Sequence, residues 1–153
     1  PRELSRNNIM RIGQLGEGAF GEVFKAELTE TTAGHTLKVL TAVKSLHLDS
    51  ASEQARDNLL KEGALMSLFN HRNVLSLVGI VTAPRDMSVL LVTSHCENGS
   101  LLEYLQTKDR VVSMNTKLTF CAEVARGLDY ISTRRVVKAP VSYHTNHLFK
   151  VAW

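Results

Sequence analysis

The sequence predicts an α+β fold in which strands fill most of the first half and helices follow. Five stretches have the alternation or the β-branched and aromatic content of strands; they are 8–15, 21–28, 37–44, 74–82 and 88–93. The hydrophobic spacing changes to that of a helix between about 50 and 69, and again over 116–132. These two changes of period predict a sheet with one main helix and further helices after it.

Composition places the chain among globular proteins. Its 153 residues are 44% hydrophobic and 22% charged, which suits one ordinary domain with a real core. The net charge of +3 is mild, and no basic segment interleaved with aromatic residues indicates nucleic acid. Cys96 and Cys121 have no disulfide or metal spacing, so two free thiols are expected. No apolar run approaches the ~18 residues of a membrane span.

A glycine-rich segment, Gly16-x-Gly18-x-x-Gly21, carries the strongest local signal. Glycines at this spacing occur in dinucleotide-binding turns and in phosphate-binding hairpins. A dinucleotide turn opens a helix, whereas residues 22–28 alternate like a strand. The pattern therefore predicts a hairpin whose backbone N–H groups approach a polyphosphate.

A cation and a carboxylate follow on neighbouring elements. In the strand 37–44, the period of two places Ala42 and Lys44 on one face. In the helix 50–69, Glu62 falls within the apolar stripe, whose members are Ala55, Leu59, Glu62, Met66 and Phe69. Either Glu62 pairs with Lys44, because an unpaired buried carboxylate is costly, or the edge of the stripe lets it reach water.

Loops and shorter elements complete the prediction. Threonines and Gly34 indicate a loop over 29–36, and Pro84 a connection over 83–86. Residues 94–99 form a polar linker, and Ser100 caps a short helix at 101–106. In the helix over 116–132 one side carries apolar residues, namely Leu118, Cys121, Val124, Ala125, Leu128 and Ile131.

The order of these parts resembles the N-terminal lobe of protein kinases. The glycine segment is followed by Thr41-Ala42-Val43-Lys44, which is similar to the kinase V-A-I-K strand, and then by a helix with an inward glutamate. The segments 69–74, 97–101 and 125–130 are most similar to tyrosine kinases, receptor kinases included. The resemblance covers residues 1 to about 137. It implies a five-stranded antiparallel N-lobe sheet with one main helix, plus the first helices of the C-lobe.

The resemblance implies an ATP site. Gly16, Gly18 and Gly21 would fold over the phosphates. Lys44 would neutralise the α- and β-phosphates while Glu62 holds it, which favours the ion pair between them.

It also implies an adenine pocket. Its apolar roof would consist of Leu15, Val23 and Ala42. Thr93 would be the gatekeeper of the space behind the base. Ser94 and Cys96 would offer backbone hydrogen bonds to the adenine edge, beside a half-exposed His95.

The same resemblance divides the chain into four parts. These are the N-lobe at 1–93, the hinge at 94–99, the start of the C-lobe at 100–137 and a divergent tail at 138–153. The tail matches no kinase segment. Its His144 and His147 are three residues apart, but their neighbours supply no third metal ligand, and no metal site is predicted.

The residues after Asp129 depart from the family pattern. No Asp or Glu follows it, so the catalytic aspartate and the Mg²⁺-binding aspartate of kinases have no counterpart here. We therefore expect ATP binding by the chain, with Mg²⁺ and phosphorylation of protein tyrosines belonging to the complete domain. The chain alone is expected to be inactive.

Three readings remain open: the first half of a tyrosine kinase, a catalytically silent lobe that binds kinase partners, and an incomplete gene model. Expected partners are a nucleotide and the protein substrates or partners of a kinase, without nucleic acid. The expected location is the cytoplasm, either for a free protein or for the intracellular part of a plasma-membrane receptor.

Overall fold

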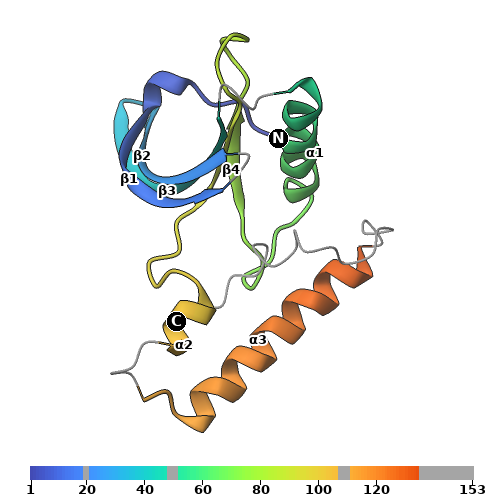
Figure 1. The fold of residues 1–153 in the computed structure, drawn as a ribbon. Helices are drawn as coiled ribbons and strands as arrows, with labels where there is room; N and C mark the ends of the chain where they lie inside the picture. The colour runs from blue at the N-terminus through green and yellow to red at the C-terminus, as the bar shows by residue number, and fades with distance from the viewer. Residues whose placement is uncertain (19–20, 48–51, 107–110, 135–153) are drawn as a thin grey trace. The chain divides into compact units, whose positions relative to one another are not determined.

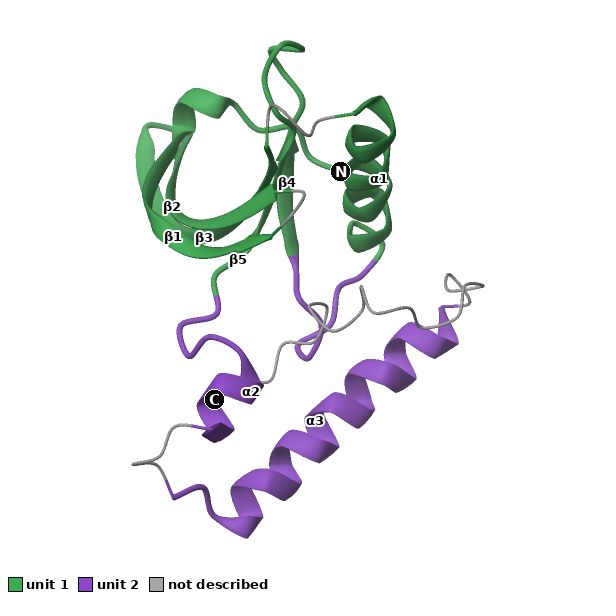
Figure 2. Ribbon diagram, viewed as in Figure 1, with its two compact units in different colours: residues 1–68, 77–95 green, residues 69–76, 96–153 purple. Residues whose placement is uncertain are grey.

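The computed structural model describes residues 1–18, 21–47, 52–106 and 111–134. The chain divides into two compact units. Unit 1 comprises residues 1–68 and 77–95, and unit 2 comprises 69–76 together with 96–153 (Figure 2). Both units are therefore built from two separate segments. Within the described residues no helix is long and apolar enough to cross a membrane.

Unit 1 is a five-stranded antiparallel sheet with one main helix, as the sequence predicted. The strand order is β1-β2-β3-β5-β4, and Figure 1 shows the first three strands as one curved layer. Its elements are η1 (Arg6–Asn8), β1 (Ile9–Gly18), β2 (Gly21–Thr32), β3 (His35–Leu46), α1 (Glu53–Met66), β4 (Leu77–Val81) and β5 (Leu90–Ser94).

The loop predicted over 29–36 is wrong. Paired strands run through it until Thr32 faces His35, and only Ala33 and Gly34 form the turn. Both turn residues have positive φ, 50° and 81°, as a tight two-residue hairpin requires. The threonines that suggested a loop are β-branched and suit an extended hairpin equally well.

The last two strands are shorter than predicted. β4 begins at Leu77 rather than at residue 74, and β5 begins at Leu90 rather than at 88. Val74 is buried in unit 2 instead, where it belongs to an isolated bridge and not to β4, and its burial accounts for its hydrophobicity.

The two faces of the sheet have different roles. One face packs a core that includes Phe24, Ala26, Val43 and Val92. Since alternate residues point to opposite faces, Leu91 lies on the other one. There α1 approaches so closely that a Cβ on Gly63 would lie 2.7 Å from Leu91 Cδ1.

Serine caps set where the helices begin. In unit 1 the Ser52 hydroxyl accepts from Ala55 N at 3.1 Å, at the start of α1. Unit 2 contains α2 (Leu101–Gln106) and α3 (Met114–Thr133). Ser100 accepts from Glu103 N at 3.2 Å, as predicted. Ser113 caps α3, which begins at Met114, two residues before the predicted start.

The segment 69–76 joins α3 within unit 2. The Asn70 N–H donates to the Tyr130 hydroxyl at 2.9 Å, and the His71 ring stacks on the Tyr130 ring at 4.8 Å. α2 and α3 line an apolar groove of about 660 Å³. Part of the predicted apolar side of α3 lies in it, namely Cys121, Val124, Ala125 and Leu128.

Candidate functional site

Lys44 and Glu62 form an ion pair between β3 and α1. Lys44 Nζ lies 2.7 Å from Glu62 Oε2, and the two side chains are 45% and 38% exposed. Both sequence alternatives therefore hold, because Glu62 has a cationic partner and also reaches water. Such an exposed pair contributes at most about 1 kcal/mol to stability. The main consequence of the pair is that the Lys44 amino group is held in a defined position.

Sheet register groups three predicted pocket residues with Lys44. Val23 faces Lys44 across β2 and β3, and Ala42 faces Thr93 across β3 and β5. Directly opposite residues share a face, as do alternate residues of one strand. Val23, Ala42 and Thr93 therefore lie on the face of Lys44. Thr93 is buried there and its hydroxyl donates to the Ala42 carbonyl at 3.2 Å.

The three glycines of the glycine-rich segment differ in their surroundings. A Cβ on Gly21 would lie 2.2 Å from the Ser45 carbonyl oxygen, so glycine is needed there for β2 to approach β3. A Cβ on Gly16 would meet nothing within 4 Å among the described residues, and one on Gly18 only a carbonyl at 3.8 Å. Leu15, at an irregularity of β1, is 49% exposed.

The remaining predicted residues fall in different parts of the chain. Ser94 ends β5 opposite Thr41, and its buried hydroxyl has no hydrogen-bond partner in the described part of the chain. Cys96 belongs to unit 2 and is a free, half-buried thiol. His144 and His147 lie outside the described residues. Among the residues that are described, no three His, Cys, Asp or Glu gather as metal ligands would.

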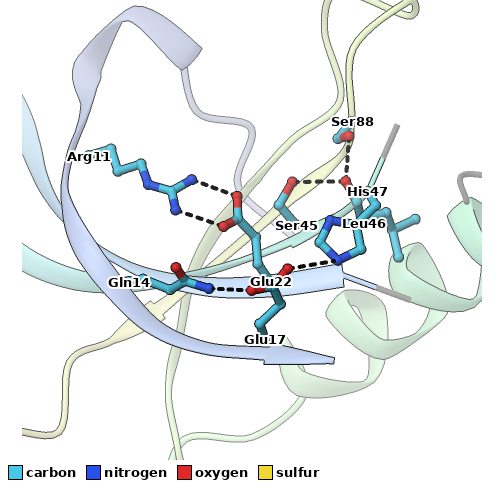
Figure 3. Close-up of polar contacts among 8 residues, drawn as sticks. All are labelled: Arg11, Gln14, Glu17, Glu22, Ser45, Leu46, His47 and Ser88. Carbon is cyan, nitrogen blue, oxygen red and sulfur yellow. Dashed lines mark hydrogen bonds and ion pairs between the residues drawn. The ribbon is translucent and has the colours of Figure 1, made fainter. Parts of the chain in front are cut away.

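A polar network that the sequence did not predict surrounds the end of β1 (Figure 3). The Arg11 guanidinium donates to both Glu22 carboxylate oxygens, at 2.6 and 2.7 Å. Gln14 Nε2 donates to Glu17 Oε2 at 2.9 Å, and Glu17 Oε1 lies 3.8 Å from His47 Nε2. The network thus links β1, β2 and the end of β3.

The Arg11 and Glu22 contacts shift both pKa values. The hydrogen bond from Arg11, followed by the charges of Arg11 and His47, lowers the pKa of Glu22. The same bond raises the pKa of Arg11. Arg11 also lies over the Phe24 ring, 4.7 Å from its centroid. The sequence signal for this pair was the presence of opposite charges on adjacent strands. Because β1 shifts register just after Arg11, simple alternation does not place Arg11 opposite Glu22.

Comparison with known proteins identifies one matching family model. The model of protein tyrosine and serine/threonine kinases matches residues 9–142. That match includes most of each unit and all the predicted pocket residues.

Individual relatives are identical to this chain at about one residue in three. Tyrosine-protein kinase SPK-1 of Girardia tigrina is 32% identical over 136 residues, which are 88% of this chain and 25% of that protein. Fer-related kinase 1 of Caenorhabditis elegans is 34% identical over 142 residues, 93% of this chain and 34% of that protein. Human receptor tyrosine-protein kinase erbB-4 is 29% identical over 136 residues, 89% of this chain and 10% of that protein. The chain thus spans between 10% and 34% of the length of these relatives.

Proposed function

Because the chain belongs to the protein tyrosine and serine/threonine kinase family, we propose that it forms the ATP-binding portion of a protein tyrosine kinase. Its fold is that of a kinase N-lobe followed by the start of the helical C-lobe. The observation that carries the proposal is the 2.7 Å contact between Lys44 and Glu62, on the sheet face that also carries Val23 and Ala42.

The phosphate end of the site is proposed around Lys44. Glu62 holds the amino group, and 45% of the Lys44 side chain stays exposed to meet an anionic ligand. Among the described residues, a Cβ on Gly16 would meet nothing within 4 Å, and one on Gly18 would meet only the Gly21 carbonyl oxygen at 3.8 Å. A cation held in place beside an open glycine backbone suits a polyphosphate, because both the charge and the N–H groups attract its oxygens.

The adenine end is proposed on the same sheet face. Leu15, Val23 and Ala42 supply its apolar roof, with Thr93 as gatekeeper. The Thr93 hydroxyl is engaged by the Ala42 carbonyl, so it limits space through its bulk. Ser94 and Cys96 are proposed to bind the adenine edge through backbone groups.

Protein kinases use Mg²⁺ together with ATP, and the metal neutralises charge on the phosphates being transferred. The donor set here does not fit such an ion, since the described residues hold no cluster of three His, Cys, Asp or Glu. Residues 130–153 also contain no Asp or Glu, and we propose that the Mg²⁺ ligands and the catalytic base belong to the complete domain.

Tyrosine specificity and location rest on the relatives. Two of the relatives above have names that call them tyrosine-protein kinases, one of them a receptor. We propose protein tyrosines as the substrates of the complete domain. We also propose a cytoplasmic location, for a free kinase or for the intracellular part of a receptor.

A pair of matched lysine variants tests the proposal. Lys38 also lies on β3 and also binds a carboxylate at 2.7 Å, that of Glu27. Lys44→Met should weaken binding of a fluorescent ATP analogue about tenfold or more, the value of one charged hydrogen bond. Lys38→Met should leave the dissociation constant unchanged. Equal affinities of the two variants, or an unmodified chain that binds no nucleotide, would refute the proposal.

A second candidate function is a catalytically silent module that binds kinase partners. One observation favours it, namely that residues 130–153 contain no Asp or Glu. It predicts nucleotide binding without phosphate transfer to a tyrosine peptide. Phosphate transfer by the unmodified chain that is lost in the Lys44→Met variant would exclude this second candidate.

A further inference from the structure

His47 follows β3 and reaches back to the end of β1. Its Nε2 lies 3.2 Å from the Gly18 carbonyl oxygen and 3.8 Å from Glu17 Oε1. Gly18 ends β1 and pairs with Gly21, which in turn pairs with Leu46 just before His47. The imidazole therefore spans the three strands at the end where the glycines lie.

Two carboxylates and two guanidiniums lie around His47. Glu17 faces it from β1, and Glu22 faces it from β2 with Arg11 bound to its carboxylate (Figure 3). These groups belong to or border a cavity of about 590 Å³, which is lined by Arg6, Arg11, Glu22, Ser45, His47 and Ser88 among others. The Arg6 guanidinium does not bind these carboxylates but donates a hydrogen bond to the Ser88 carbonyl.

A positive charge on the His47 imidazole would add a second contact to β1. A neutral imidazole donates one N–H, which the Gly18 carbonyl can accept. An imidazolium keeps that bond and adds an attraction to the Glu17 carboxylate. Histidine is the side chain whose charge changes most readily in the physiological pH range, so a contact of this kind can respond to pH.

We propose that His47 is a positioning residue for the nucleotide site, which holds Gly18 and Glu17 at the end of β1 and does so more firmly when it is protonated. This inference rests on the proposed ATP site. It predicts that His47 contributes more to nucleotide affinity at pH 6 than at pH 8. His47 itself does not touch the nucleotide.

The test compares dissociation constants for the fluorescent ATP analogue at both pH values. ATP takes up a proton in the same range, so the informative quantity is the ratio of variant to unmodified chain at each pH. His47→Gln keeps an N–H donor and loses the charge, so its ratio should be about threefold to fivefold at pH 6, the value of one exposed ion pair, and near one at pH 8. His47→Ala should weaken binding at both pH values. His35→Gln, at the start of β3 next to the β2–β3 turn, should give a ratio near one throughout.

An NMR titration separates this inference from the proposed function. The resonances of the backbone amides of Glu17 and Gly18 should shift together with those of the His47 imidazole as the pH changes. Amide chemical shifts that do not follow the His47 titration would overturn the inference. A His47→Gln ratio that is the same at both pH values would overturn it too. Coupled amides in a chain that binds no ATP would instead refute the proposed function and leave the contact standing.

Discussion

Lys44 and Glu62 are 18 residues apart in the sequence, yet Lys44 Nζ lies 2.7 Å from Glu62 Oε2. Packing next to the pair explains the contact. Leu91 pairs with Lys44 across β3 and β5, and Gly63, the neighbour of Glu62, packs on Leu91. The absence of a side chain on Gly63 lets α1 come close enough for the carboxylate to reach the amino group.

Glu62→Gln should separate positioning from stability. The free energy of unfolding should change by no more than about 1 kcal/mol, because the pair is exposed. Affinity for the ATP analogue should fall about fivefold, since Lys44 loses the charge that holds it. Glu27→Gln, which removes the equivalent partner of Lys38, is the control and should leave affinity unchanged. A loss of affinity in both variants would contradict this prediction.

Gly21→Ala and Gly16→Ala should differ in stability. At Gly21 the new Cβ would lie 2.2 Å from the Ser45 carbonyl oxygen, and a backbone atom cannot move aside cheaply. We expect a loss of about 1–3 kcal/mol, as for overpacking. At Gly16 no described atom lies within 4 Å of the new Cβ, so the midpoint of denaturant unfolding should stay nearly constant. Equal midpoints for the two variants would refute this account.

Glu22 should stabilise the fold in a pH-dependent way. Its pKa in the folded state is lowered, first by the hydrogen bond from Arg11. A lowered carboxyl pKa stabilises the fold above the ordinary value of about 4.3, and this contribution is lost as pH falls through the folded-state pKa. Glu22→Gln should therefore be less stable than the unmodified chain at pH 7 and should converge with it in acid. Unfolding midpoints measured from pH 7 to pH 3 check this, and a constant difference would count against it.

Tyr130→Phe should loosen the segment 69–76. The variant keeps the ring that stacks on His71 but leaves the Asn70 N–H without its acceptor. We expect a loss of about 0.5–1.5 kcal/mol and faster hydrogen exchange at Asn70. Tyr130→Leu should cost more, because it also removes the stacked ring. Unchanged exchange at Asn70 in Tyr130→Phe would show that the hydroxyl does not hold this segment.

Local pattern determined much of this protein. Alternation and helical spacing identify all five strands, α1, α2 and most of α3, since each depends on neighbours along the chain. The order of short motifs also identifies the family, which the match over residues 9–142 confirms. Strand ends were less predictable. The threonines of 29–36 suit both a loop and a strand, and only pairing with the opposite strand decides between them.

Tertiary structure decided what the pattern left open. Whether Glu62 pairs or reaches water depends on how closely α1 packs on β5, and both turn out to hold. The network of Arg11, Glu22, Glu17 and His47 depends on a register shift in β1 and on where β3 ends. No alternation rule specifies either feature. Residues that meet across strands do so through the geometry of the whole sheet, and that geometry is set by packing among residues distant in the sequence.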